Sequence, residues 1–185
     1  MLKSLLSALL VATMFFTNGY SQSFVLMPTG LRDSADTGKS FLVLKFDSLT
    51  AKQLYDNAIK YINKTYTNPD QVIKGKTENE YLRYITHVAS FIMIKSGLSR
   101  VKFDADYTVE LNFKEGKVRY EITSLDMENS GGWKLKITGG GFAWYIYNKN
   151  GELKKEDAKK DIEQYFNYRI KSLTETLNGR IKENW

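Results

Sequence analysis

The chain has 185 residues, which suits one ordinary domain, and 42% of them are hydrophobic and 26% charged, a balance that excludes a largely disordered chain. The absence of cysteine excludes disulfides, thiol nucleophiles and thiolate metal sites. The net charge of +6 comes from Lys and Arg interleaved with Asp and Glu along the whole chain, which favours a solvated surface over a nucleic-acid-binding tract.

Residues 1–21 have the pattern of a secretory signal peptide. An apolar segment, Leu5–Phe16, is followed by Gly19 and Ser21, which place small side chains just before a cleavage point ahead of Gln22. As a helix this segment would span roughly 18 Å, short of the ~30 Å hydrocarbon core of a bilayer. We therefore expect the leader to be removed, the protein to be exported to the periplasm or secreted, and no transmembrane segment to remain.

The mature chain is expected to begin with an extended lead-in, residues 22–40, which mixes Pro, Gly, Ser and Asp without a period. A single domain is then predicted over residues 41–185. It opens with a short apolar strand at 41–46 and a helix over about 51–66. The helix is predicted from a capping box, an apolar stripe at steps of three and four, and a closing Asn-Pro pair.

A meander of about five strands is predicted after this helix. The segment 104–114 alternates between apolar and polar residues, and 117–125 alternates again after a Glu-Gly turn, which predicts an antiparallel hairpin with one buried and one wet face. The residues expected on the buried face of the first strand are Ala105, Tyr107, Val109, Leu111 and Phe113. A short strand is expected at 72–76, and a strand with apolar groups on both faces over the long β-branched and aromatic run 81–94.

Two further strands, 133–138 and 142–147, are joined by three glycines, which we interpret as a hairpin linkage. A long amphipathic helix over about 156–181 closes the chain. The order of strand, helix, strands and helix predicts an α+β fold, in which a single curved antiparallel sheet carries two helices on one face. The sequence lacks the strand–helix alternation of a doubly wound sheet.

Two segments resemble a known family. They are TAKQLYDNAIKYINKTY from Thr50 to Tyr66 and YTVELNFKEGKVRY from Tyr107 to Tyr120. Both are similar to the exported bacterial domain of unknown function 4468, a family with a TBP-like fold, and the similarity extends over roughly 41–178. The resemblance implies a curved antiparallel sheet that grips helices, and it brings no activity and no functional residues with it.

The TBP-like fold does not imply nucleic-acid binding here. DNA binding by such a sheet belongs to duplicated intracellular proteins that insert apolar wedges into the minor groove, whereas this chain has one unit and an export signal. The polar face of the predicted hairpin also carries Asp104, Asp106, Glu110 and Glu121, which would repel phosphate. We expect no nucleic-acid partner.

The residues that could carry chemistry are few. His87 is the sole histidine and lies inside an apolar strand, which is typical of a structural role, and one histidine cannot form a multi-histidine metal site. Asp104 and Asp106 share a strand face but lack the spacing of a calcium loop. We therefore predict no catalytic residues, no metal site and no cofactor, and we do not expect an enzyme.

Aromatic residues are dense near the end of the strand region. This density makes four residues the candidate binding residues: Trp133, Trp144, Tyr145 and Tyr147. The favoured function is a non-enzymatic binding or structural module of the bacterial cell envelope, with an envelope protein or a glycan as partner. Two alternatives stay open: a carrier that holds a small apolar ligand between the sheet and the C-terminal helix, and a hydrolase that uses a carboxylate pair.

Overall fold

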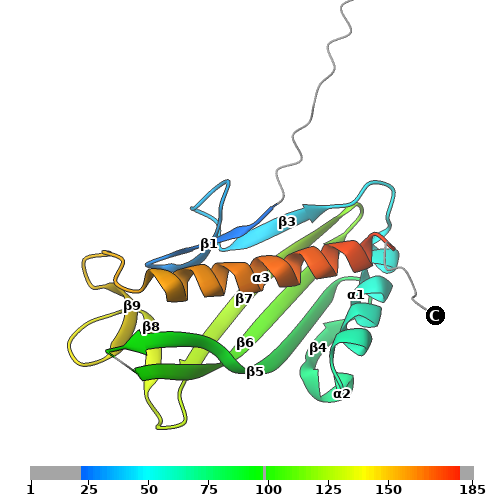
Figure 1. Ribbon diagram of the computed structural model, residues 1–185. Coiled ribbons are helices and arrows are strands. Elements are labelled where there is room, and N and C mark those ends of the chain that lie inside the picture. Colours follow the sequence, from blue (N-terminus) through cyan, green and yellow to red (C-terminus); the bar gives the residue numbers. More distant parts are fainter. Residues whose placement is uncertain (1–21, 98, 180–185) are drawn as a thin grey trace, which may run out of the picture.

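A computed structural model describes residues 22–97 and 99–179 of the chain (Figure 1). The predicted signal peptide, residues 1–21, lies outside the described residues. The elements in chain order are β1 Phe24–Met27, β2 Gly30–Asp33, β3 Phe41–Lys45, α1 Ala51–Thr65, α2 Pro69–Val72, β4 Ile73–Thr77, β5 Tyr81–Ser96, β6 Ser99–Lys114, β7 Lys117–Glu128, β8 Lys134–Gly139, β9 Trp144–Asn148 and α3 Glu156–Leu177.

Seven strands form one large, mostly antiparallel sheet in the order β4-β5-β6-β7-β8-β9, with β3 paired to the first half of β7. The five residues predicted to form the inner face of β6 are all buried, and Asp106 between them is exposed, so the predicted register is correct. Strand β5 is bulged between Val88 and Ile92, where Ser90 takes a φ of 51°. The bulge turns the end of the β5–β6 hairpin toward β9, where Phe103 meets the ring of Trp144.

Strands β8 and β9 are parallel, with Leu135 paired to Trp144 and Gly139 to Asn148. The prediction of a hairpin across the three glycines is therefore wrong, and the sheet is not wholly antiparallel. Gly141 takes a φ of 68°, a conformation that glycine adopts at no steric cost, and the chain doubles back within the four residues that separate the strands. This return places the starts of β8 and β9 at the same edge of the sheet.

Helix α1 begins as predicted. Thr50 Oγ1 accepts from the Gln53 N–H at 3.2 Å, and Gln53 Oε1 accepts from the Thr50 N–H at 2.9 Å, which completes a capping box. A four-residue helix that was not predicted, α2, follows with Pro69 at its first position. The described residues thus form three helices, where two were predicted.

Helix α3 lies along one face of the sheet and is covered on its apolar side by β1 and β5 (Figure 1). Its buried residues repeat at steps of three and four, as predicted. They are Ala158, Ile162, Phe166, Ile170, Leu173, Thr176 and Leu177. Ile181, the last residue of the predicted stripe, lies outside the described residues. Within the described ranges, no helix combines the length and the apolar character needed to cross a bilayer.

The lead-in contains an ordered hairpin, because β1 and β2 pair to form a separate two-stranded sheet that packs on α3. Phe24 donates its N–H to Asn167 Oδ1 at 2.7 Å, and Asn167 Nδ2 donates to the Phe24 carbonyl at 3.0 Å. The N–H of Leu26 donates to Glu163 Oε1 at 2.7 Å. Side chains of α3 therefore supply the hydrogen bonds that a neighbouring strand would otherwise supply to β1.

Replacing Asn167 tests this attachment. We expect Asn167→Ala to lower the free energy of unfolding by about 2 kcal/mol, because the N–H and the carbonyl of the half-buried Phe24 backbone both lose their partner. Asn167→Asp keeps an acceptor for the N–H but turns a carboxylate oxygen toward the Phe24 carbonyl, so it should lose at least as much. Urea unfolding measures both, and equal midpoints for Asn167→Ala and the unmodified protein would show that the hairpin does not depend on this side chain.

Candidate functional site

Two large aromatic side chains protrude at the end of the sheet where β8 and β9 begin. Trp133 is 59% exposed, and Phe142 is fully exposed at 104%. Each residue lies two positions before the paired residues Leu135 and Trp144, so the parallel register brings both to one end of the sheet. We call this region, made of Trp133, Phe142 and the half-buried Trp144, the aromatic end.

The loop that carries Trp133 is held by hydrogen bonds to one side chain. Asn129 Oδ1 accepts from the N–H of Gly131 at 3.0 Å and from the N–H of Trp133 at 2.9 Å. The Asn129 N–H also donates to the Trp133 carbonyl at 3.0 Å. The backbone of Trp133 is thus fixed on both sides while its ring remains in solvent, which lowers the entropic cost of using the ring as an anchor.

The four aromatic residues predicted to bind do not form one platform. Trp133 is exposed, whereas Trp144 packs edge-on against Phe103 at 5.6 Å between ring centroids. Tyr145 is half-buried. Tyr147 is buried, and its hydroxyl donates to the Leu26 carbonyl at 2.6 Å, which makes it a structural residue.

Phe142 belongs to this surface, although it was not among the predicted site residues. Its neighbours in the sequence offered a signal, because a bulky aromatic directly after three glycines lies in a connection and not in a strand. The alternation of 142–147 masked that signal by suggesting a strand that starts at Phe142. In the structure β9 starts at Trp144.

Cations gather beside the aromatic end. Lys155 lies over the ring of Trp144, with Nζ 5.8 Å from the centroid, and shares a hollow of about 170 Å³ with Lys95. On the β5–β6 hairpin, Lys95 pairs across the strands with Arg100, and Lys102 pairs with the exposed Met93. We call Lys95, Arg100, Lys102 and Lys155 the basic patch.

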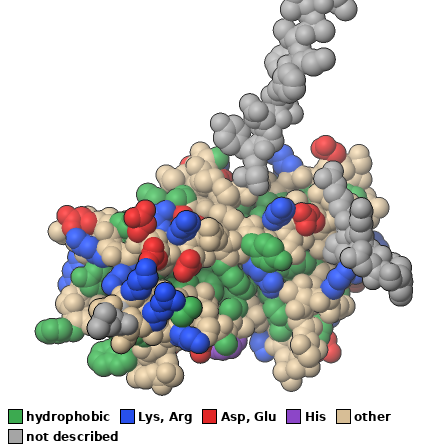
Figure 2. Space-filling view, in the orientation of Figure 1, with side chains coloured by type: hydrophobic (Ala, Val, Ile, Leu, Met, Phe, Trp, Pro, Cys, Tyr) green, Lys and Arg blue, Asp and Glu red, His purple; other side chains and the backbone are tan. Residues whose placement is uncertain are grey.

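None of these four cations forms an ion pair with a carboxylate in the part of the chain that the structure describes. The surface around them is not purely basic, because Glu156, Asp157 and Asp161 line the same hollows. Figure 2 shows hydrophobic side chains protruding at the lower left edge of the molecule, with Lys and Arg side chains gathered next to them. The exposed apolar side chains of the aromatic end therefore lie beside the cations of the basic patch.

A second group of aromatic residues surrounds Arg169 between the helices and the sheet. Its guanidinium lies 5.6 to 5.9 Å from the ring centroids of Tyr61, Tyr66 and Tyr165, and Nη2 donates to the Tyr66 hydroxyl at 2.9 Å. The Tyr165 and Tyr107 hydroxyls are 2.9 Å apart. These contacts hold a half-buried cation by ring faces and one hydroxyl, which is an arrangement suited to joining α1 to α3.

Burial changes the acidity of these tyrosines. It raises the pKa of Tyr61 to about 12, although the Arg169 charge acts in the opposite direction. Burial also raises the pKa of Tyr84, Tyr107 and Tyr120 above the ordinary tyrosine value. The phenols therefore stay protonated at neutral pH, and none of them is prepared to act as a base.

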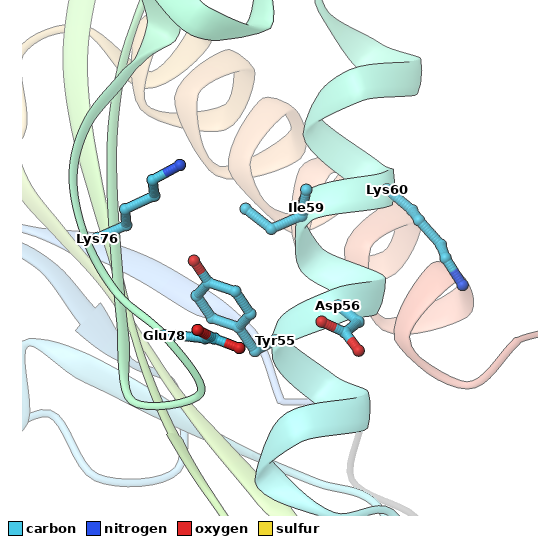
Figure 3. A pocket seen from close by; sticks show the side chains of 6 residues that line it. All are labelled: Tyr55, Asp56, Ile59, Lys60, Lys76 and Glu78. Atoms are coloured by element: carbon cyan, nitrogen blue, oxygen red, sulfur yellow. The ribbon is translucent and has the colours of Figure 1, made fainter.

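An open groove of about 560 Å³ lies between α1 and β4 (Figure 3). Tyr55 and Ile59 of α1 face Lys76 of β4 and Glu78 of the following turn, while Lys60 points away from the groove. The charged residues of the lining are two lysines and two carboxylates, those of Asp56 and Glu78. Neither sign of charge therefore dominates the groove. Strand β4 is an edge strand, and its exposed lysines hinder pairing with a further strand.

His87 lies on the outer face of the sheet. Its Nδ1 is 3.1 Å from Asp106 Oδ1 on the neighbouring strand, and both side chains are more than half exposed. A carboxylate that orients a histidine is part of many catalytic sites, but these two residues lie on an open surface that does not exclude water. Residues 22–97 and 99–179 contain no cluster of three or more His, Asp or Glu side chains that could hold a metal ion.

The space between the sheet and α3 is filled by rings. Phe166 has no exposed surface, and its ring centroid lies 5.1 Å from that of Tyr107 and 5.9 Å from that of Phe91. These contacts occupy the place where a carrier would hold an apolar ligand. The candidate functional site is therefore the aromatic end with its basic patch.

The large, mostly antiparallel sheet and the helices on its inner face define an α+β protein of the TBP-like fold. The sequence profile of the domain of unknown function DUF4468 with TBP-like fold matches residues 41–128. That segment belongs to this family, as the resemblance of the two sequence segments implied. No curated protein matches the chain.

Two solved structures are similar to this one. A DUF4468 family protein from Bacteroides ovatus has a TM-score of 0.55 and 16% identity, over 74% of this chain and 84% of its own. A TBP-like protein from Parabacteroides distasonis has a TM-score of 0.45 and 7% identity, over 77% of this chain and 92% of its own. At this identity, the first similarity supports the fold and nothing about activity.

Proposed function

We propose that the protein is an exported, non-enzymatic binding module of the bacterial cell envelope, and that the aromatic end is its binding surface. The observation that carries the proposal is the exposure of Trp133 and Phe142 on loops at one edge of the sheet. Exposing two rings of this size to water is unfavourable, and a partner that covers them gains the corresponding free energy of burial. The leader pattern of residues 1–21 supports export.

A non-enzymatic role is favoured by where the titratable groups lie. The tyrosines with raised pKa values pack against one another and against Arg169, and the His87–Asp106 pair lies on an open strand face. Beside the aromatic end, the four cations of the basic patch form no ion pairs with described carboxylates. Such a surface is suited to adhesion.

Fractionation of a bacterial host with two membranes tests the proposal. The full chain should leave the cytoplasm and sediment with the envelope, and a chain that starts at Gln22 should stay in the cytoplasm. We expect Trp133→Ser/Phe142→Ser to be exported normally but to be at least tenfold depleted from the envelope pellet, since the partner no longer covers two rings.

Tyr168→Ser is the matched control, because Tyr168 is a 66% exposed aromatic residue on α3. This variant should sediment like the unmodified protein. Retention of the full chain in the cytoplasm would contradict export. Equal sedimentation of the double variant and the control would show that the aromatic end is not the binding surface.

A further inference from the structure

We propose that the aromatic end binds directly to the surface of an anionic lipid membrane, with the two rings in the interface and the basic patch on lipid phosphates. This inference rests on the proposed function and names the chemistry of the partner. Its starting observation is the exposure of Trp133 and Phe142, which lie just before the paired strands β8 and β9 and line neither the groove beside α1 nor the hollows beside the basic patch. Rings that protrude can enter a soft interface without a complementary cavity in the partner.

The side-chain types favour the membrane interface. Trp is enriched at the boundary between lipid headgroups and acyl chains, where its apolar ring and its polar N–H are both satisfied. The Asn129 hydrogen bonds fix the backbone of Trp133, so the ring is presented without ordering a loop. Phe142 has no polar atom on its side chain and would enter more deeply.

The cations supply charge complementarity. Lys155 and Lys95 share a hollow next to Trp144 with Lys154, Glu156 and Asp157, so cations outnumber carboxylates there by three to two. Arg100 and Lys102 extend the patch along the hairpin of β5 and β6. A lysine near an anionic bilayer surface strengthens binding by about fivefold. Lysine and arginine stems can also lie along the interface while their charged ends reach phosphate.

The same observations disfavour the other kinds of partner. Protein interfaces are depleted of lysine at their centre, whereas Lys134 directly follows Trp133 and is exposed. A glycan platform needs ring faces aligned for stacking, and Trp133 and Phe142 come from separate loops, while Trp144 packs edge-on against Phe103. An anionic lipid surface is the partner that uses both the rings and the unpaired cations.

Vesicle flotation tests the inference without any envelope protein or glycan. The chain from Gln22 onward, which contains every element that the structure describes, is mixed with vesicles of pure phosphatidylcholine or of an equal mixture with phosphatidylglycerol. We expect at least tenfold tighter binding to the mixed vesicles, and a loss of that preference at high salt, because the patch is exposed and screened by ions. A shift of Trp emission to shorter wavelength should accompany binding, and Trp133→Phe should abolish most of it.

Variants separate the two contributions. Trp133→Ser/Phe142→Ser should weaken binding to the mixed vesicles by more than tenfold, and Lys95→Gln/Lys155→Gln by about 25-fold, at fivefold for each charge. Tyr168→Ser and Lys64→Gln/Lys171→Gln, which remove an exposed ring and the same charge elsewhere, should bind normally. Equal unfolding midpoints of all variants exclude loss of structure as the cause.

Equal affinity for both kinds of vesicle, or no binding to either, would overturn the inference. Unchanged vesicle binding by Trp133→Ser/Phe142→Ser would also overturn it. If vesicles fail to bind while sedimentation with the envelope still requires the two rings, the partner is a protein or a glycan. The proposed function would then stand without the lipid. If, in addition, the double variant sediments with the envelope like the unmodified protein, both proposals fail.

Discussion

The protein is expected to unfold when the pH rises from about 10 to 12, because its core holds tyrosines that cannot ionise in place. Burial raises the pKa of Tyr61 to about 12, and that of Tyr84, Tyr107, Tyr120 and Tyr165 above the ordinary value. In the unfolded chain these phenols ionise near pH 10. Between pH 10 and 12 the unfolded state therefore binds fewer protons than the folded state, and the free energy of unfolding falls as the pH rises.

The size of the effect follows from the number of groups. The four phenols with the largest increases, those of Tyr61, Tyr84, Tyr107 and Tyr120, each remove up to about 1.4 kcal/mol per pH unit, so together they remove about 5 to 6 kcal/mol per unit. This is comparable to the whole stability of an ordinary domain. Exposed lysine ion pairs, such as Lys52–Asp56, also weaken in this range, but each contributes little. Below pH 10 the tyrosine contribution is fully present, so these groups cause no change of stability with pH there.

Circular dichroism and tyrosinate absorbance, recorded together on raising the pH, measure this transition. Exposed tyrosines such as Tyr168 should ionise first, near pH 10, and the remaining rise in tyrosinate absorbance should coincide with the loss of circular dichroism, since ionisation of the buried phenols requires unfolding. Tyr120→Phe should reduce the slope of stability against pH by about a quarter, whereas Tyr168→Phe, on an exposed ring, should leave it unchanged. Smooth ionisation of all tyrosines near pH 10 without unfolding would show that these phenols are not buried.

The parts of the fold that local patterns specify were predictable from the sequence. The capping box at Thr50 fixed the start of α1, and strict alternation fixed the inner face of the β6–β7 hairpin, because a shift of one residue would bury Asp106 and expose Tyr107. The stripe at steps of three and four located α3. In each case one element carries its own signal, and packing only confirms it.

Contacts between distant segments account for what was missed. The β1–β2 hairpin depends on Asn167 and Glu163, which lie more than 130 residues away in the sequence, so its own composition predicts only an extended segment. The parallel pairing of β8 and β9 depends on which edge of the sheet is open. The same pairing brings together the starts of the two strands that Trp133 and Phe142 precede, and the candidate site was therefore only partly predictable from the aromatic density alone.

Phe166→Ala is expected to lower the free energy of unfolding by about 3 to 5 kcal/mol, which is the usual range when a fully buried ring is removed and leaves a cavity. The ring of Phe166 meets three others, those of Phe91, Tyr107 and Tyr165, and none can move into the space without leaving its own contacts. Phe166→Leu should lose less, because Leu fills part of the cavity. Urea unfolding of the three proteins measures the difference.

Tyr168→Ala on the same helix is the control, and it should change stability by no more than about 0.5 kcal/mol because its ring is largely exposed. A loss below about 1 kcal/mol for Phe166→Ala would mean that the space under α3 is loosely filled. That outcome would restore the carrier of a small apolar ligand as a function, since such a carrier needs room at this place. A large loss instead leaves the exposed rings at the starts of β8 and β9 as the apolar surface available to a partner.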